Sequence, residues 1–389
     1  MRTFLVVSIL AATLTFLSAP MGAQADRVDV YSGETPAQMM DRLRAEAVNG
    51  NLDAAIAELS DYVRDHPTAI VAARLLGDFY YRKPDIPAAE RVYKEIVYRF
   101  PQDRETWNRL GGIYAAEDRI DEAIAAFDRS VPEPSAYPNL VELHRRRGDL
   151  RQFEEDVAAQ AKRNPTDERT LLIYGNVLRA VHKYDGAIAT LEQALQYGHD
   201  RCPPLNDLAN TYLDMGRVSD AIPLLQQCLA MEPKAYFALV NLGDAYIMLG
   251  RYDVAQTWLQ RAVQEDAYRA EAYVDIGYLQ DVAQRWKSAM SYYEKAIDVD
   301  PMSRDAYIDL GYDYNEQGLY TLAEAAFLKG LAVAPHDGRL AFMLGMTYGL
   351  QGKLELAKQE YQRALADSDE DVVLAAARQE LSSLRTRQP

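Results

Sequence analysis

Apolar residues along most of the chain recur at spacings of three and four, and the stretch VNLGDAYIMLGRYDVAQTWLQRAV at 240–263 is representative. Its first half aligns Leu242, Tyr246 and Leu249, and its second half aligns Leu259 and Val263, which is the periodicity of amphipathic helices. The turn-forming sequence LGRYD separates the two halves. The pattern therefore predicts two helices joined by a short turn.

The same pair of helices is predicted again at a regular interval along the chain. The stretch aligns with VDIGYLQDVAQRWKSAMSYYEKAI at 274–297 and then with IDLGYDYNEQGLYTLAEAAFLKGL at 308–331. Six such units run from 168 to 371 without an insertion, and the frame extends back to Pro36. A period of about 34 residues is typical of solenoids, in which each unit packs only against its neighbours.

A glycine lies inside the first helix of most units, although a glycine there costs about 1 kcal/mol relative to alanine. Gly243 aligns with Gly277 and Gly311 in the repeat frame, and a small residue in the second helix recurs in the same way, as at Ala255 and Ala289. We therefore interpret the glycine as a packing residue that lets two antiparallel helices approach each other closely.

These units resemble the tetratricopeptide repeat family, whose signature has large residues at repeat positions 4, 7, 11 and 24, small ones at 8, 20 and 27, and proline at 32. The third unit matches it most fully, with Trp107, Leu110, Gly111, Tyr114, Ala123 and Phe127. The resemblance covers residues 36–371. It implies an all-α fold, a right-handed superhelix of about ten helix-turn-helix repeats whose first helices line a concave groove.

The repeat frame also predicts the boundaries along the chain. We expect a linker at 26–35, repeats one to three at 36–133, a degenerate fourth repeat at 134–167, repeats five to ten at 168–371, and a capping helix and tail at 372–389. The fourth repeat has Val141 and Phe153 where small residues belong. Because Pro132, Pro134 and Pro138 also limit helix continuity, we expect a break in curvature near residues 131–140.

Residues 1–25 have the pattern of a secretory signal peptide. Arg2 precedes the apolar run FLVVSILAATLTFL at 4–17, and Ala23 and Ala25 form an A-x-A cleavage signal before Asp26. An uncleaved anchor is the alternative, but the run at 4–17 is short for spanning a bilayer. We expect a periplasmic or secreted protein without a transmembrane segment after cleavage.

Charge and motif content argue against two large classes of function. The formal net charge of −16 disfavours a nucleic-acid partner. No phosphate-loop, hydrolase-elbow or metal-ligand spacing is present, and the histidines are isolated: His66, His144, His182, His199 and His336. Because the repeats, the cap and the signal peptide account for nearly every residue, we expect no enzyme, no cofactor and no metal.

The resemblance places the concave face at repeat positions 2, 5, 6, 9, 12 and 13, and the charge at these positions changes along the chain. The first five repeats carry mainly arginines there: Arg44, Arg74, Arg82, Arg109, Arg145, Arg146, Arg169 and Arg179. The last five carry mainly acids: Asp207, Asp214, Asp244, Glu271, Asp275, Asp281, Asp305, Asp309 and Glu316. We expect a groove that changes sign, whose acidic half focuses a negative potential. The alternative is that these charges only keep the solenoid soluble.

Some members of the family hold the carboxylate end of a peptide with lysine, arginine and asparagine side chains in this groove. Asn210 and Asn241 match the two asparagine positions. Asn206 stands where the first lysine is expected, and Glu271 and Asp275 replace the last two cations. Because these acids would repel a carboxylate, the groove is not expected to bind a peptide end in this way.

Aromatic residues at the same inner positions accompany the acids: Phe237, Tyr278, Tyr312 and Phe342. Acids that steer encounter and rings that supply contact area suit a protein or peptide segment that is basic and has an apolar anchor. We therefore expect an exported, non-enzymatic adaptor. The alternative is a scaffold for cell-envelope or exopolysaccharide assembly and secretion, with tyrosines stacked on sugar rings.

The two cysteines, Cys202 and Cys228, fall at positions 1 and 27 of the sixth repeat. Positions 8 and 20 touch in an antiparallel pair, so contacting positions sum to about 28, and the two thiols are expected to face each other. Export would favour a disulfide. The alternative is that Cys228 only supplies the small residue of the signature, because helix axes roughly 8–10 Å apart can hold Cα atoms too far apart to be bridged.

Overall fold

The computed structural model describes residues 34–131, 136–199, 201–368 and 371–387, so the predicted signal peptide, most of the linker, Pro132 and Pro134 lie outside it. The described residues contain only helices as regular structure. These are α1 (Pro36–Glu46), the π-helix η1 (Ala47–Asn51), α2 (Leu52–Asp65), α3 (Ile70–Arg82), α4 (Ile86–Arg99), α5 (Arg104–Ala116), α6 (Ile120–Ser130), α7 (Ala136–Arg147), α8 (Leu150–Arg163), α9 (Glu168–Ala180), α10 (Tyr184–Tyr197), α11 (Cys202–Asp214), α12 (Val218–Met231), α13 (Tyr236–Met248), α14 (Tyr252–Glu265), α15 (Glu271–Val282), α16 (Trp286–Val299), α17 (Arg304–Glu316), α18 (Tyr320–Val333), α19 (Gly338–Leu350), α20 (Leu354–Asp367) and α21 (Asp371–Arg387).

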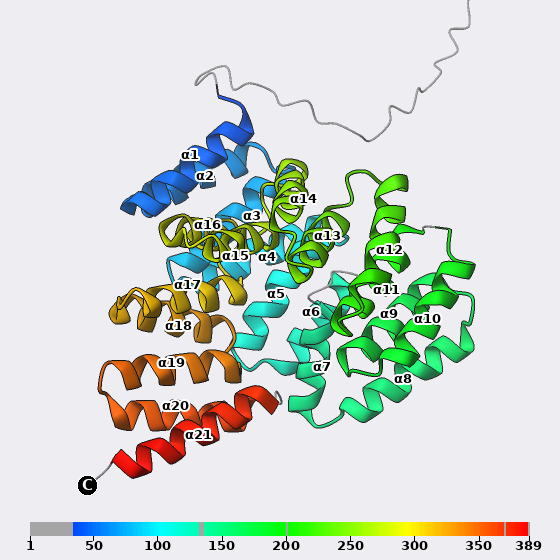
Figure 1. Ribbon diagram of the computed structural model, residues 1–389. Helices are drawn as coiled ribbons and strands as arrows, with labels where there is room; N and C mark the ends of the chain where they lie inside the picture. The colour runs from blue at the N-terminus through cyan, green and yellow to red at the C-terminus, as the bar shows by residue number, and fades with distance from the viewer. Residues whose placement is uncertain (1–33, 132–135, 200, 369–370, 388–389) are drawn as a thin grey trace, which may run out of the picture.

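Consecutive helices pair from α1 and α2 to α19 and α20, and each pair packs on the next, as Figure 1 shows. The final helix, α21, lies against α19 and α20 and covers the end of the stack. The predicted all-α solenoid is thus confirmed.

The turn inside each pair uses a backbone conformation that favours glycine. Gly250 has φ +68°, and Gly216, Gly318 and Gly352 at the equivalent positions have φ between +70° and +75°. Asp118 takes φ +60° at the same place in an earlier repeat. This left-handed residue ends the first helix and lets the second return antiparallel to it.

The mid-helix glycines are packing residues, as predicted, but the residue that fills the space above them is not the small alanine. A Cβ atom on Gly277 would lie 2.5 Å from Cε1 of Tyr293, and one on Gly243 would lie 2.6 Å from Cδ2 of Leu259. Both partners occupy the same large position in the second helix of their repeat. The glycine therefore makes room for a large side chain between the two helices.

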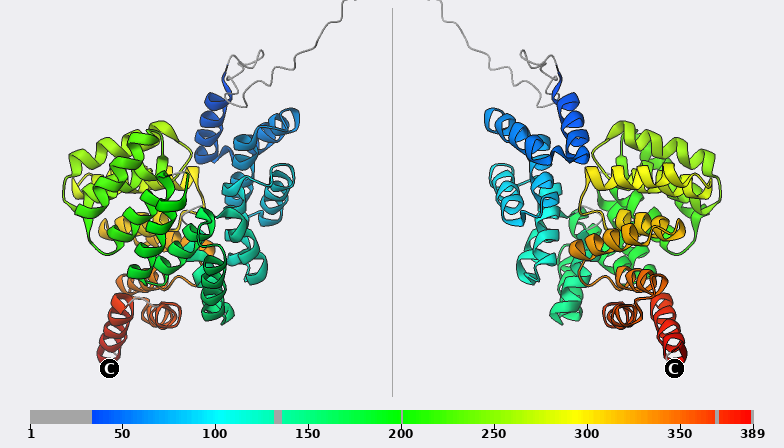
Figure 2. Two further views of the ribbon diagram at one scale, coloured as in Figure 1. Left: turned by 90° about the vertical axis from the view of Figure 1, so that its right-hand side faces the viewer. Right: turned by 90° about the vertical axis from the view of Figure 1, so that its left-hand side faces the viewer.

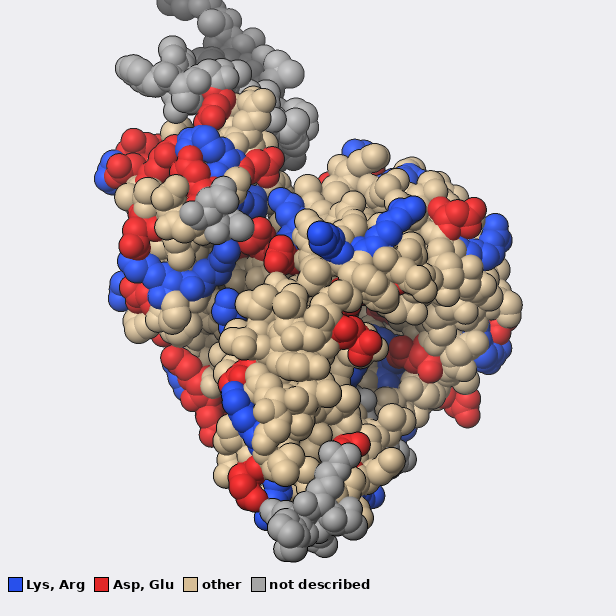
Figure 3. All heavy atoms as spheres, turned by 60° about the vertical axis from the view of Figure 1, so that its left-hand side comes forward, with Lys and Arg blue, Asp and Glu red and all other residues tan. Residues whose placement is uncertain are grey.

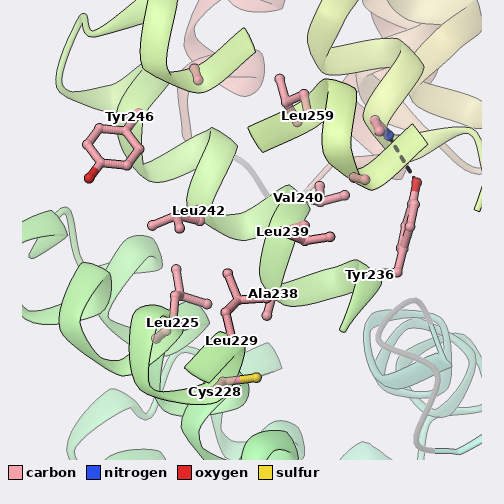
Figure 4. Packing of buried hydrophobic residues seen from close by; sticks show 14 of the residues in the cluster. Leu225, Cys228, Leu229, Tyr236, Ala238, Leu239, Val240, Leu242, Tyr246 and Leu259 are labelled. Atoms are coloured by element: carbon pink, nitrogen blue, oxygen red, sulfur yellow. Dashed lines mark hydrogen bonds between the residues drawn. The ribbon is translucent and has the colours of Figure 1, made fainter. Parts of the chain in front are cut away.

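Packing between neighbouring repeats adds a polar contact to the apolar core. Figure 4 shows Leu239, Leu242 and Leu259 packed between helices of successive repeats. At the edge of this cluster the backbone N–H of Ala272 donates a hydrogen bond to the hydroxyl of Tyr236, at 3.2 Å. The contact joins α13 to α15 across two repeats.

The degenerate fourth repeat is built differently from the others. Val141 of α7 is buried, and the ring of Phe153 in α8 stacks on His144 with centroids 3.9 Å apart. Nδ1 of His144 lies 3.0 Å from a carboxylate oxygen of Asp149. His144 thus has a structural role, and α7 also packs directly on α9.

The superhelix turns far enough for repeats that are distant in the sequence to touch. The guanidinium of Arg44 lies over the ring of Tyr268 at 4.5 Å, and Arg82 forms an ion pair with Asp298 at 3.0 Å. Met302 packs against the apolar cluster of α4 to α7, and α18 contacts α5. Figure 2 shows the blue and cyan N-terminal repeats beside the yellow and orange repeats near the C-terminus. Repeats seven to nine therefore lie against repeats one to three.

Candidate partner-binding groove

The predicted acidic residues of three successive first helices come together on the concave face. Asp244 of α13, Asp275 of α15 and Asp309 of α17 are each partly buried. The carboxyl groups of Asp244 and Asp275 lie within hydrogen-bonding reach of each other. Figure 3 shows one face of the molecule, where acidic and basic side chains lie around a hollow beside the lobe that ends at the C-terminus.

A second pair of acids lies one step further along the same helices. Tyr293 donates a hydrogen bond to Oδ2 of Asp281 at 2.5 Å. The carboxyl group of Asp313 lies within hydrogen-bonding reach of Asp281. Asp313 is only 1% exposed, and neither of its carboxylate oxygens has a hydrogen-bond donor among the described residues. We did not predict Asp313 from the sequence because it falls outside the family's groove positions.

Burial and mutual repulsion raise the pKa values of these carboxyl groups. Desolvation is the largest cause throughout, and it raises the pKa of Asp244 to about 6. The pKa of Asp309 is raised to about 7, because repulsion from Asp305 adds to desolvation. Next to Asp281, the pKa of Asp313 is raised to about 8. The pKa of Asp275 is also raised, by burial and by Asp244. These carboxyl groups therefore bind protons at a higher pH than ordinary aspartates do.

Exposed apolar side chains line up beside the acids. Tyr278, Tyr312 and Met346 occupy the same repeat position on α15, α17 and α19 and are 45%, 47% and 38% exposed. The other two predicted aromatics are partly covered. The guanidinium of Arg269 lies 4.3 Å from the ring of Phe237, and the ring of Phe342 packs against Tyr361 with centroids 5.6 Å apart.

The remaining residues predicted for the acidic half are three asparagines and three acids. Asn241 donates a hydrogen bond to Asn206 at 2.8 Å, next to the partly buried Asn210. Three acids are exposed to solvent: Asp214, Glu271 and Asp305. The asparagines thus bond to each other. Two of the three exposed acids form ion pairs within the chain, Asp214 with Arg179 and Asp305 with Arg304, each at 3.0 Å.

The predicted basic half does not form an open basic groove, because most of its arginines pair with acids of the same chain. Arg109 is buried and binds Asp78 with Nε 2.8 Å from Oδ1. Four more arginines form ion pairs: Arg74 with Asp103 and Glu105, Arg145 with Glu142, Arg146 with Asp118 and Arg179 with Asp214. Arg169 is exposed. Asp300, on the turn that carries Met302, lies 3.9 Å from Arg109 and covers part of this half.

The structure joins Cys202 and Cys228 in a disulfide, with Cα atoms 4.5 Å apart. Cys202 is the first residue of α11, and Cys228 lies in the last turns of α12. Both residues are buried. The bond therefore ties the two helices of the sixth repeat together at one end.

Neither a metal centre nor a membrane span is found among the residues that the structure describes. No group of three or more His, Cys, Asp or Glu side chains there is arranged to hold a metal ion. None of the described helices combines the length and the apolar character that crossing a membrane requires.

Stacked helix pairs with a glycine or alanine at the close approach define an α-solenoid of helical repeats. The sequence model described as tetratricopeptide repeat matches residues 40–104, 76–141, 206–270, 274–337 and 308–372, which together exceed half of the chain. The chain therefore belongs to the tetratricopeptide repeat family, whose fold is generally non-catalytic.

Curated relatives match only part of the chain. Tetratricopeptide repeat protein 21B of Mus musculus is 25% identical over 185 residues, which are 47% of this chain and 12% of that protein. The chloroplastic tetratricopeptide repeat domain-containing protein PYG7 of Arabidopsis thaliana is 26% identical over 154 residues, 35% of this chain and 51% of that protein. The match thus spans about half or less of the length of either relative.

The chain was also compared with solved structures. The human IFIT1 dimer with m7Gppp-AAAA is 18% identical and covers 86% of this chain and 87% of its own, with a TM-score of 0.53. A structure of MamA is 30% identical over 41% of this chain and 94% of its own, with a TM-score of 0.34. At 18% identity, the likeness to IFIT1 is one of fold alone.

Proposed function

We propose that this protein is an exported, non-enzymatic adaptor that binds a basic segment of another protein, with an apolar anchor, in the acidic C-terminal half of its concave face. Proteins built from tetratricopeptide repeats bind protein or peptide partners. The observation that carries the proposal is the column of exposed Tyr278, Tyr312 and Met346 beside the partly buried acids. Rings and sulfur atoms would supply contact area, and the acids would steer a basic partner.

One contact in the same groove already places an arginine of the chain over an aromatic ring, as we propose for a basic partner. Arg269 lies over the ring of Phe237, and it also lies 5.3 Å from the ring of Tyr236. A cation over an aromatic face contributes roughly 0.5–2 kcal/mol, depending on its desolvation. Tyr278 and Tyr312 offer more exposed faces to an arginine or lysine of a partner.

Export is supported by the signal-peptide pattern of residues 1–25 and by the disulfide between Cys202 and Cys228, since disulfides persist in oxidising compartments. The absence of a catalytic motif supports a non-enzymatic role. The acidic charge supports a protein partner over a nucleic acid.

The test is to capture partners with the purified, oxidised protein from an envelope extract and to map cross-links on it. We expect a protein partner cross-linked near Tyr278 and Tyr312, and weaker capture by the Tyr278→Ser, Tyr312→Ser double variant. Tyr98→Ser is the matched control, because Tyr98 is 84% exposed on the second helix α4. Equal capture by both variants would contradict the proposal. Recovery of a polysaccharide in place of a protein would favour the assembly scaffold.

A further inference from the structure

Polar pairs join the first helices of neighbouring repeats, and they recur at the same two repeat positions. Asp78 of α3 pairs with Arg109 of α5 at 2.8 Å. At the same two positions Asn176 of α9 donates to Asp207 of α11 at 2.6 Å. Each pair joins a donor of the chain to a carboxylate of the chain.

Further along the chain the same positions hold two acceptors. Asp244 and Asp275 have the same separation in the sequence and occupy the positions of Asp78 and Arg109. Their carboxyl groups meet with no arginine or asparagine between them. Two carboxylates in contact repel each other, so the pair is stable only with a bound proton or with a cation from outside.

A second set of positions shows the same replacement. Asn315 donates to Oγ1 of Thr347 in the next repeat, at 2.8 Å. One repeat earlier the equivalent residues are Asp281 and Asp313, two carboxyls in contact. Asp313 is buried and has no donor among the described residues. Because neutral or charge-matched residues fill these positions in other repeats, stacking of the repeats does not require the acid pairs.

We propose that the pairs Asp244–Asp275 and Asp281–Asp313 are subsites for two lysine or arginine side chains of the bound segment, and that each pair releases its proton to solvent when the cation binds. The inference rests on the proposed function and deepens it. The ligand supplies the charge that Arg109 supplies to Asp78. Asp244, Asp275 and Asp281 are partly exposed and can be reached, whereas Asp313 lies behind Asp281 and acts through it.

The groups that face the two pairs add negative charge and very little positive charge. Glu271 of α15 and Asp309 of α17 face Asp275. Tyr293 of α16 bonds to Asp281, and Asp309 and Glu316 of α17 face Asp313. One cation, Arg339 of α19, acts on these acids, because its charge lowers the pKa of Asp309. The pKa of Asp275 is raised by burial and by Asp244, and that of Asp313 is raised to about 8, which supports one bound proton in each pair near neutral pH.

The experiment measures proton release during binding. A synthetic peptide of alternating lysine and leucine is titrated into the full, oxidised protein by calorimetry at pH 7, in two buffers of different ionisation enthalpy. We expect one to two protons to be released per peptide bound. A matched peptide with citrulline in place of lysine should neither bind tightly nor release protons.

Two variants use replacements that the chain itself provides. Asp244→Asn recreates the pair Asn176–Asp207, and Asp281→Asn with Asp313→Thr recreates the pair Asn315–Thr347. Each should weaken binding about tenfold, lower the number of released protons, and leave the melting temperature unchanged or higher. Asp253→Asn, at an exposed acid on α14, is the control and should behave like the wild type.

The outcomes separate the two proposals. Failure of the unaltered protein to bind the lysine peptide would contradict the proposed function itself. Binding with unchanged affinity and proton release in the repaired variants would overturn the subsites and leave the proposed function in place. Loss of binding together with a lower melting temperature would also overturn them, because the acids would then be needed for the fold.

Discussion

At the scale of single residues, the mid-helix glycine connects packing to the groove. The ring above Gly277 is that of Tyr293, and the hydroxyl of the same ring holds Asp281. The ring is therefore fixed at both ends. The equivalent space above Gly243 is filled by Leu259, whose methyl groups can rotate away. In the sixth repeat, Ala209 takes the place of the glycine and faces Leu225, so the chain already tolerates alanine against leucine.

Gly277→Ala should therefore lower the free energy of unfolding, by about 1–3 kcal/mol, because the new methyl group meets a ring that cannot move away. Gly243→Ala is the matched control, and here the gain in helix propensity of about 1 kcal/mol offsets the smaller clash. Urea denaturation of both variants measures the difference. Equal effects of the two substitutions would show that the glycine is not there to accommodate the ring.

At the scale of elements, the disulfide ties α11 to α12 within one repeat. Repeats couple mainly to their neighbours, so the loss of one tie should act locally. Closing a loop between residues 26 positions apart stabilises a fold by roughly 3 kcal/mol in the chain-entropy model.

Reduction, or Cys228→Ala, should therefore lower hydrogen-exchange protection in residues 202–231 and their neighbouring repeats, while α3 to α6 keep theirs. Thiol titration of the denatured, unreduced protein should find no free thiol. Two free thiols would exclude the disulfide in the protein as isolated.

The acids on α13, α15 and α17 make stability depend on pH. Their pKa values in the fold are raised above the unfolded value near 4, so the folded state binds more protons between these values. The stabilisation is complete below about pH 4 and is lost as the pH rises through about 6 to 8. Other carboxylates, such as Asp149 beside Arg147, have lowered pKa values. Their contribution to stability is lost as the pH falls to acidic values.

The melting temperature should accordingly fall between pH 5.5 and pH 8.5, and the decline should be smaller in the Asp281→Asn, Asp313→Thr variant. The measurement is thermal unfolding by circular dichroism across this range. A parallel decline in the variant and the wild type would mean that other groups titrate.

The helices and their neighbours could be predicted from the sequence because both follow from local periodicity. The spacing of Leu242, Tyr246 and Leu249 predicts a helix, and the recurrence of the same pattern in the next repeat predicts what it packs against. Asp313 was missed because it lies one step outside the groove positions of the family. Its fixed distance from Asp281, matched by Asn315 and Thr347, was the signal in the sequence that could have revealed it.

At the scale of the whole molecule, the closure between repeats one to three and repeats seven to nine could not be predicted in this way. A repeat period defines contacts between neighbours, whereas closure depends on small rotations that add up over several repeats. The residues that meet, such as Arg82 and Asp298, are far apart in the sequence and share no motif. The closure explains two of the contacts of the predicted basic half, Arg82 with Asp298 and Arg109 with Asp300. Most of the other arginines of that half pair with acids of their own or a neighbouring repeat.

The ion pair of Arg82 with Asp298 tests whether polar contacts hold this closure. The two side chains are 19% and 18% exposed, so water and salt screen the pair only in part. Arg82→Glu alone and Asp298→Arg alone should each place like charges together and cost roughly 1–3 kcal/mol. Small-angle X-ray scattering should then show a larger radius of gyration for each single variant. Because the double variant restores opposite charges, its radius should return towards that of the wild type. Unchanged scattering of both single variants would show that the apolar contacts of Met302 and Tyr268 are sufficient for closure.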